Sequence, residues 1–132
     1  MARQVFLSHS GRDTWVAEQI AREMRDVGAT TFLDREEIDI GANFEEEIRK
    51  ALASSQEFVV LLTPWALDRP YIWLEVGAAF VQGLYLAAVL HGLSPADIQS
   101  NKKIPVFIKG RNLVEINDLP KYFKQLKRRV SS

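Results

Sequence analysis

Short apolar runs recur along the chain at intervals that are typical of strands. The runs at 4–8, 57–63 and 84–90 are almost uninterrupted, and such runs predict strands that are covered on both faces. The segment 29–34 is rich in β-branched and aromatic residues and predicts another strand. The apolar run at 104–108 predicts the last one. The pattern therefore predicts five strands.

Between these runs, apolar residues recur every three or four positions, which predicts amphipathic helices. The expected helical segments are 12–28, 44–54, 68–82, 94–99 and 116–130. Their ends carry the usual start and stop residues. Asp13 is a candidate cap for the first helix and Gly28 its stop, Asp68 and Pro70 indicate a helix start, and Asn117 or Asp118 is a candidate cap for the closing helix.

Strands that alternate with helices predict an α/β fold with a parallel sheet and right-handed crossovers. In such a sheet, ligands bind outside the carboxyl ends of the strands. The loops at those ends are 8–13, 34–43, 63–71 and 90–95. We therefore expect the functional residues to lie in these loops or in the first turns of the helices that follow them.

Composition narrows the function classes. The 132 residues correspond to one domain, and 17 basic side chains balance 17 acidic ones. A net charge of zero gives no general attraction to nucleic acid or to a membrane. There is no cysteine, which excludes disulfides, thiolate zinc sites and a cysteine nucleophile. Two histidines far apart in sequence predict no metal site. The chain is expected to be cytoplasmic.

One ionisable side chain stands out. From Tyr71 to Phe80 every residue except Glu75 is apolar or glycine. Helical spacing places Tyr71 and Glu75 on one face. An acid in such a run is either a half-exposed helix residue that pairs with a cation or a functional carboxylate, and the pattern alone leaves both open.

Three small folds share this layout, and their loops separate them. A phosphate-accepting receiver domain needs acids where the first and third strands end, but this chain has Ser8-His9 and Thr63-Pro64 there. A flavodoxin needs a phosphate-binding loop after the first strand, but Asp13 lies where the anion would bind. Neither fold fits these loops.

The third fold does, because three segments resemble the Toll/interleukin-1 receptor (TIR) domain family, particularly its bacterial NAD-cleaving members. "VFLSHSGRD" resembles the first box of the family, and "FLDREEIDIGANFEEEIRKAL" resembles the second box with its mobile loop. "EFVVLLTPWALDRPYIWLEVGAA" is similar to the segment that often carries Ser-x-Trp and a glutamate four residues later; here Arg69 and Tyr71 replace the Ser and the Trp. The resemblance implies a single TIR domain over 1–132, with a flavodoxin-like five-stranded parallel sheet and helices on both faces.

The resemblance also implies chemistry. In NAD-cleaving TIR domains the glutamate matched by Glu75 is catalytic, and NAD⁺ is the substrate rather than a bound cofactor. The nicotinamide of NAD⁺ is a cationic pyridinium that leaves as a neutral molecule, so one carboxylate suffices without a second acid. An apolar surround would strengthen its attraction for the developing positive charge. The residues expected to form that surround are Leu74, Val76, Ala78 and Ala79.

Further site residues follow from position or resemblance. Glu36 matches an acid that contacts substrate, with plain solvation as the alternative. Phe44 is a candidate for the nicotinamide side, with the core as the alternative, and Arg12 is a candidate pyrophosphate donor. The expected substrate-binding set is His9, Ser10, Arg12, Asp34, Glu36, Phe44 and Tyr71. The expected interface loop is Glu37, Ile38, Asp39, Ile40 and Gly41. Trp73 is expected to be a core residue.

Two functions remain open on the sequence. One is cleavage of the nicotinamide–ribose bond of NAD⁺, activated by homotypic TIR–TIR assembly, with ADP-ribose or cyclic ADP-ribose as product. The other is a non-catalytic signalling or adaptor module. The resemblance also implies a role in bacterial phage defence, with a sensor domain or sensor protein outside these residues as a further partner.

Overall fold

The computed structural model describes residues 3–33, 44–110 and 112–132. The strands are β1 (Gln4–Ser8), β2 (Thr30–Leu33), β3 (Glu57–Leu62), β4 (Tyr85–Leu90) and β5 (Asn112–Glu115). The helices are α1 (Thr14–Asp26), α2 (Phe44–Ala53), α3 (Pro70–Val81), α4 (Pro95–Ser100), α5 (Val106–Lys109) and α6 (Leu119–Ser131). Short 3₁₀ turns, η1 (Gly11–Asp13), η2 (Ala66–Asp68) and η3 (Ile116–Asp118), precede α1, α3 and α6.

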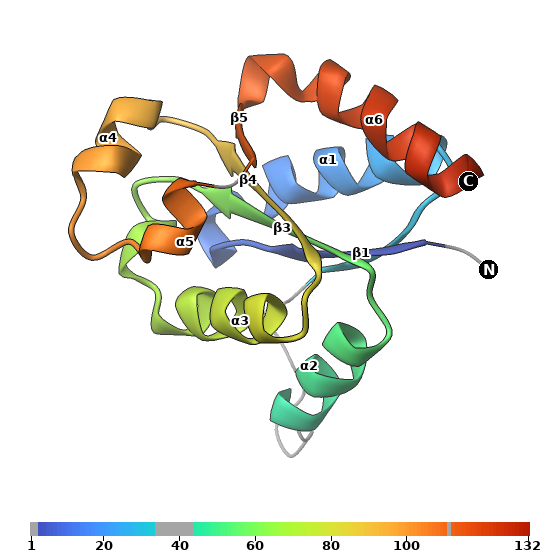
Figure 1. The fold of residues 1–132 in the computed structure, drawn as a ribbon, viewed down its shortest axis with the longest axis horizontal. Helices are drawn as coiled ribbons and strands as arrows, with labels where there is room; N and C mark the ends of the chain where they lie inside the picture. The colour runs from blue at the N-terminus through green and yellow to red at the C-terminus, as the bar shows by residue number, and fades with distance from the viewer. Residues whose placement is uncertain (1–2, 34–43, 111) are drawn as a thin grey trace.

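The strands form one sheet in the order β2-β1-β3-β4-β5, and every neighbouring pair is parallel (Figure 1). β1 and β3 therefore lie in the middle, and the register places Ser8 opposite Val60. Their carboxyl ends meet at one edge of the sheet, which we call the carboxyl edge. The predicted five-stranded parallel α/β sheet is confirmed.

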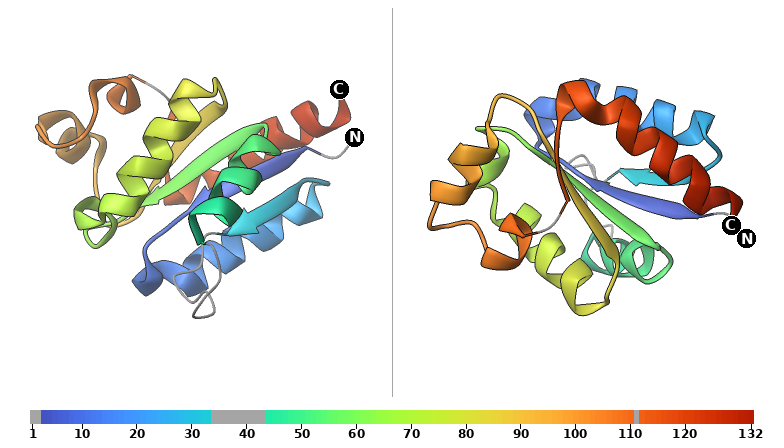
Figure 2. Two further views of the ribbon diagram at one scale, coloured as in Figure 1. Left: turned by 90° about the horizontal axis from the view of Figure 1, so that it is seen from below. Right: turned by 45° about the horizontal axis from the view of Figure 1, so that its top comes forward.

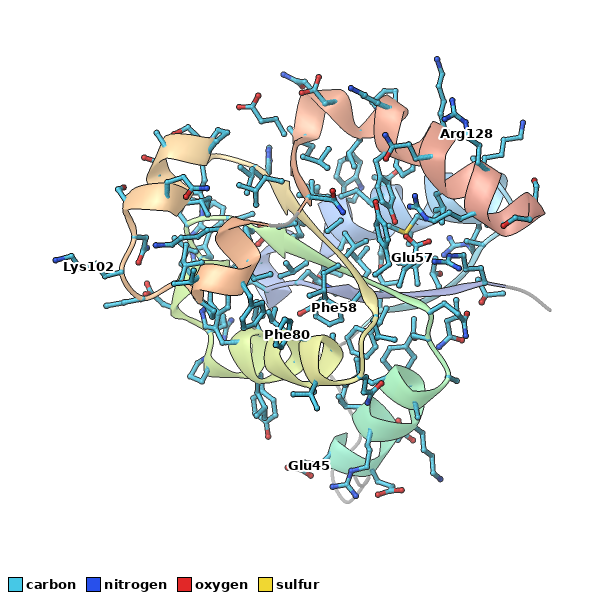
Figure 3. The ribbon with its side chains drawn as sticks, viewed as in Figure 1. Glu45, Glu57, Phe58, Phe80, Lys102 and Arg128 are labelled. Carbon is cyan, nitrogen blue, oxygen red and sulfur yellow. The ribbon has the colours of Figure 1, made fainter. Side chains whose placement is uncertain are left out.

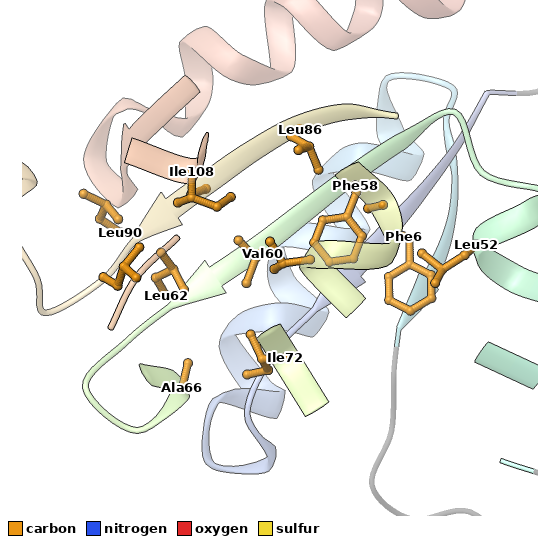
Figure 4. Packing of buried hydrophobic residues seen from close by; sticks show 14 of the residues in the cluster. Phe6, Leu52, Phe58, Val60, Leu62, Ala66, Ile72, Leu86, Leu90 and Ile108 are labelled. Carbon is orange, nitrogen blue, oxygen red and sulfur yellow. The ribbon is translucent and has the colours of Figure 1, made fainter. Parts of the chain in front are cut away.

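Helices cover both faces of the sheet. α1 and α6 pack on one face, and α2, α3 and α5 pack on the other, as Figure 1 and the two views of Figure 2 show. The side chains of each strand alternate between these two cores. In β1, Phe6 joins the core beneath α3, while Val5 and Leu7 join the core beneath α1. Figure 4 shows Phe6 beside Leu52 of α2, and Phe58 beside Val60.

The last strand differs from its prediction. The apolar run at 104–108 does not form it, because Ile104 and Ile108 are buried one helical turn apart and the short helix α5 begins after Pro105. The strand is instead β5, an edge strand that requires only partial burial, and its exposed ends are Asn112 and Glu115. A short apolar run does not by itself distinguish a strand from a buried helix.

The other boundaries lie close to their predictions, but the capping contacts differ. Gly28 follows the end of α1 with a φ of +103°, which favours glycine. Asp13 precedes α1 but makes no capping hydrogen bond, because its carboxylate accepts one from Thr63 instead. Asp118 likewise precedes α6 without a side-chain cap, and Pro70 opens α3 directly after Arg69.

A buried ion cluster lies at the amino end of β3, far along the strand from the carboxyl edge. Glu57 is fully buried and accepts hydrogen bonds from Arg3 at 2.6 Å and from Arg129 at 2.8 and 3.2 Å. Tyr122 donates a fourth hydrogen bond at 3.3 Å, and burial together with the charge of Glu57 raises the pKa of that phenol. Arg129 also stacks over the ring of Tyr85. In Figure 3, Glu57 lies between the sheet and α6.

Candidate functional site

Glu75 lies in the second turn of α3 and faces the sheet. The helix begins at Pro70, whose fixed φ and missing N–H suit the first helical position. Ile72 and Val76 lie on the same face of the helix and are buried against the sheet, and Glu75 lies between them with 2% of its surface exposed.

 Ala79, one turn further along, completes this buried apolar face. Leu74 was expected to be part of the apolar surround, but it is 66% exposed and lies at the surface, where it borders the cavity between α2 and α3 that also has Glu75 in its wall.

The carboxylate of Glu75 is held from the neighbouring strand. Ser8 Oγ donates a hydrogen bond of 2.8 Å to Glu75 Oε1, and both residues are buried. Ser8 is the last residue of β1 and lies on the same side of the sheet as Phe6, which is the side that α3 covers. The contact therefore joins the end of a central strand to the second turn of α3. Ser8 was not among the residues expected from the sequence.

A cavity of about 730 Å³ lies between α2 and α3 and has Glu75 in its wall. α2 contributes Ile48 and Arg49, and α3 contributes Tyr71 and Ala78 besides Glu75. The volume lies within the range of about 300–1,000 Å³ that is usual for small-molecule sites. A mostly apolar wall with a few polar groups is also usual for such sites. The arrangement can therefore hold a ligand part with a flat ring next to a carboxylate.

Tyr71 and Glu75 border the same cavity, as their spacing of four residues predicts. Tyr71 is about half exposed, and its hydroxyl donates to Glu45 Oε1 at 3.3 Å. Trp73 is half-buried against the core, and its indole N–H donates to the carbonyl oxygen of Leu67 at 2.9 Å. Trp73 also borders the cavity beside Glu75, so the prediction that it is a core residue holds only in part.

The loop after β1 lies at the same edge of the sheet. His9 and Ser10 are buried, and Ser10 Oγ accepts a hydrogen bond from the backbone N–H of Arg12 at 3.3 Å, so it caps η1. Arg12 itself is exposed. Within the described part of the chain, none of these three residues borders the cavity beside Glu75. The structure thus places them at the expected edge but not in the cavity wall.

A second buried contact fixes the two loops that carry the site. Thr63 Oγ1 donates to Asp13 Oδ2 at 2.6 Å and accepts from the backbone N–H of Ala66 at 3.1 Å. The contact links the loop after β1 to the loop after β3, and the latter leads into α3. It therefore helps to set the position of Glu75 relative to Ser8.

A sequence model described as "TIR domain" matches residues 5–129. The chain belongs to the TIR domain family. No curated protein matches its sequence. The fold of this TIR domain is nevertheless shared by solved structures of low sequence identity.

Three such structures illustrate the likeness. The TIR domain of the Toll-related receptor TRR-2 from Hydra magnipapillata has a TM-score of 0.70 at 16% identity, over 97% of this chain and 98% of that one. A metazoan TIR-STING receptor from C. gigas has a TM-score of 0.69 at 18% identity, over 97% of this chain and 39% of that one. The TIR domains of the activated Roq1 resistosome, which recognises the pathogen effector XopQ, have a TM-score of 0.64 at 19% identity, over 98% and 84%.

Several predicted site residues of this TIR domain lie outside the described residues. They are Asp34, Glu36 and the expected interface loop of Glu37, Ile38, Asp39, Ile40 and Gly41. Phe44 opens α2, one residue before Glu45 of the cavity wall, but its side chain is not described. Over the described ranges, no three metal-ligating side chains gather in one place, and no helix has the length and apolar character needed to cross a membrane.

Proposed function

We propose that this TIR domain cleaves the bond between nicotinamide and ribose in NAD⁺, and that Glu75 is the catalytic residue. The observation that carries the proposal is the buried carboxylate of Glu75, which is bonded to the carboxyl end of a central strand and lies in the wall of a cavity large enough for a small-molecule ring. Ligands of open α/β sheets bind at this edge. The resemblance to NAD-cleaving family members supports the same assignment.

The reaction needs little from the protein. The bond between C1′ of the ribose and the pyridinium nitrogen breaks, and its electron pair goes to that nitrogen, so nicotinamide leaves neutral. Water then bonds to C1′ and releases one proton to solvent. The products are nicotinamide, ADP-ribose and a proton. No acid is needed to protonate the leaving group, in contrast to ordinary glycosides, which use two carboxyl groups.

Glu75 has two roles in this scheme. Its carboxylate holds the ribose hydroxyls and faces the positive charge that grows at C1′ as the bond breaks. Buried Val76 and Ala79 keep the surroundings of the carboxylate apolar, which strengthens such an attraction relative to water. If the adenine ring rather than water reaches C1′, the same carboxylate produces cyclic ADP-ribose.

The other contacts with NAD⁺ are assigned by position. Tyr71 borders the cavity one turn before Glu75 and can stack on the nicotinamide ring. Phe44 is proposed for the same ring, and Asp34 and Glu36 for the loop beside it. His9, Ser10 and Arg12 lie at the end of β1, where Arg12, being exposed, can reach the pyrophosphate.

Assembly is the proposed means of activation. Glu75 is 2% exposed, so a ribose reaches it only after the surroundings of the carboxylate rearrange. α3 also presents exposed apolar side chains, with Leu74 at 66% and Val81 at 84% exposure. Such residues mark surfaces that bind other proteins. Leu74 and Val81 also border the cavity beside Glu75. Contacts between TIR domains through this helix and the 37–41 loop would therefore add to the wall of the cavity and rearrange the surroundings of the carboxylate.

The biological setting follows the family. The likeness to a resistosome and to a TIR-STING receptor supports a role in immune signalling. For this chain we propose NAD⁺ depletion in the cytoplasm of bacteria during phage defence, triggered by a sensor domain or sensor protein outside these residues.

The test is nicotinamide release from NAD⁺ by purified protein, free and displayed on a multivalent support. We expect slow release by the free protein, faster release after clustering, and loss of release in Glu75→Gln. Glu57→Gln is the matched control, because it neutralises the other buried glutamate among the described residues, which lies at the opposite end of the strands. Equal loss in both variants, at a temperature where both are folded, would assign the effect to the fold rather than to Glu75.

The exposed apolar side chains of α3 also favour a second candidate, a non-catalytic adaptor that only binds other TIR domains. The same assay separates the two. Clustered protein that releases no nicotinamide, yet binds a second copy through Leu74 and Val81, would leave the adaptor as the function.

A further inference from the structure

We propose that Ser8 is the positioning residue of the site, and that its hydroxyl sets the orientation in which Glu75 meets the ribose. The inference rests on the proposed function. Its starting point is the hydrogen bond of 2.8 Å from Ser8 Oγ to Glu75 Oε1, between residues 67 positions apart in sequence.

The location of Ser8 leaves its side chain few other roles. Alternation along β1 places it on the α3 side of the sheet, where the preceding residue on that side is the core residue Phe6. A third apolar residue in this position would extend the core that Phe6 and Val60 build. A hydroxyl there instead provides a donor inside an otherwise apolar layer. Buried polar groups need hydrogen-bond partners, and Glu75 supplies one for Ser8.

The bond constrains the carboxylate more than helix packing alone does. A glutamate side chain has three rotatable bonds, and the backbone of α3 restricts only the first of them. A donor on a rigid central strand selects one orientation of the carboxylate. A carboxylate has about four lone-pair positions, so Oε1 can accept from Ser8 and still accept from a ribose hydroxyl. Ser8 can therefore remain bonded while substrate binds.

The strand end that carries Ser8 is itself held in place. The contact between Thr63 and Asp13 ties the loop after β1 to the loop after β3 at the same edge of the sheet. Ser8 is also in register with Val60 of β3, the strand that leads into α3. Donor and acceptor thus sit on elements whose separation is fixed from both sides, as an active-site contact requires.

The experiment compares Ser8→Ala with Ser55→Ala in the clustered protein. Ser55 is a matched control because its hydroxyl is also buried and donates at 2.7 Å, but to the carbonyl oxygen of Ala51 at the amino end of the sheet. We expect Ser8→Ala to lower kcat for nicotinamide release about 10- to 100-fold, the usual effect of losing a hydrogen bond to a charged group, with KM within about twofold. Ser55→Ala should leave kcat within about twofold. Equal kcat in Ser8→Ala and wild type would overturn the proposal.

A second readout does not depend on activity. In protein labelled with ¹³C at glutamate carboxyl groups, Glu75→Gln identifies the Glu75 resonance. We expect Ser8→Ala to shift that resonance and Ser55→Ala to leave it unchanged. In wild type, the hydroxyl proton of Ser8 should exchange slowly and correlate with the Glu75 carboxyl carbon, a result that requires no variant to fold.

The two readouts distinguish the two proposals. A wild type that releases no nicotinamide but shows the Ser8–Glu75 correlation would refute the proposed function while confirming that Ser8 holds the carboxylate. A wild type that is active but lacks the correlation, and whose Glu75 resonance is insensitive to Ser8→Ala, would refute the positioning role alone.

Discussion

The cluster around Glu57 predicts a large loss of stability from a small chemical change. Glu57→Gln keeps the shape of the side chain and removes its charge. In the native protein that charge faces two guanidinium groups, which retain only 24% of side-chain exposure in Arg3 and 22% in Arg129. The variant leaves two partly buried cations without their anion. It also weakens the paired hydrogen bonds from Arg129, which reach both carboxylate oxygens.

The size of the loss in unfolding free energy depends on how far Arg3 and Arg129 remain exposed to solvent. Removing one partner of a fully buried pair costs about 3–5 kcal/mol. Both arginines reach solvent in part, so we expect a lower value of about 2–4 kcal/mol of unfolding free energy. For a chain of this size that loss corresponds to a fall in Tm of roughly 10 °C. Because the cluster is little hydrated, high salt should reduce the difference only slightly.

The assay is urea unfolding of wild type, Glu57→Gln and Glu115→Gln, followed by circular dichroism. Glu115 is the control because it is exposed, and its neutralisation should change the unfolding free energy by less than about 0.5 kcal/mol. A loss for Glu57→Gln below about 1 kcal/mol, or one that disappears at about 1 M salt, would refute the reasoning, since either is the behaviour of a surface ion pair.

Two further predictions concern backbone and helix ends. Gly28→Ala should destabilise the fold by about 1 kcal/mol or more in the same urea assay, because φ is +103° and the new Cβ would lie 3.1 Å from Val130. In Gly77→Ala of α3 the new Cβ meets no atom within 4 Å, so this variant should be neutral or more stable by up to about 1 kcal/mol. The backbone and side chain of Ser94 lower the pKa of Asp97 below its ordinary value of 3.8. The stabilisation from this cap is therefore complete above pH 3.8 and is lost as pH falls through the lowered pKa, so the Tm difference between wild type and Asp97→Asn should vanish in strong acid. A difference that persisted there would show that the charge of Asp97 does not stabilise the cap.

Much of the fold was predictable because its central strands are nearly uninterrupted apolar runs. β1, β3 and β4 are buried on both faces, and uninterrupted apolar runs predict such strands. The edge strand β5 was predicted in the wrong place, because an edge needs only partial burial and its sequence, NLVE, carries little apolar signal. The apolar run before it leads into the short helix α5 instead, with Ile104 buried just before the helix and Ile108 buried within it.

Part of the candidate site could be predicted from the sequence, where one residue contrasts with its neighbours. Glu75 stands out as a lone acid in an apolar helix, and Tyr71 follows from the helical spacing. Ser8 was missed because a serine at the end of an apolar strand is usually just the polar residue that ends the strand. The alternation of side chains along β1 does place Ser8 on the same face of the sheet as Phe6. The contact with Glu75, however, depends on α3 covering that face, which the alternation does not reveal. Asp13 was assigned to a cap for a similar reason, because only the folded chain brings Thr63 next to it.

The central claim is that Glu75 carries out cleavage of NAD⁺. The most direct measurement is the rate of nicotinamide release by wild type and Glu75→Gln, displayed at the same density on one support and verified as folded. The account predicts steady nicotinamide release by wild type. Glu75→Gln should release nicotinamide only at the rate at which NAD⁺ breaks down without protein. Equal rates in the two proteins would contradict it.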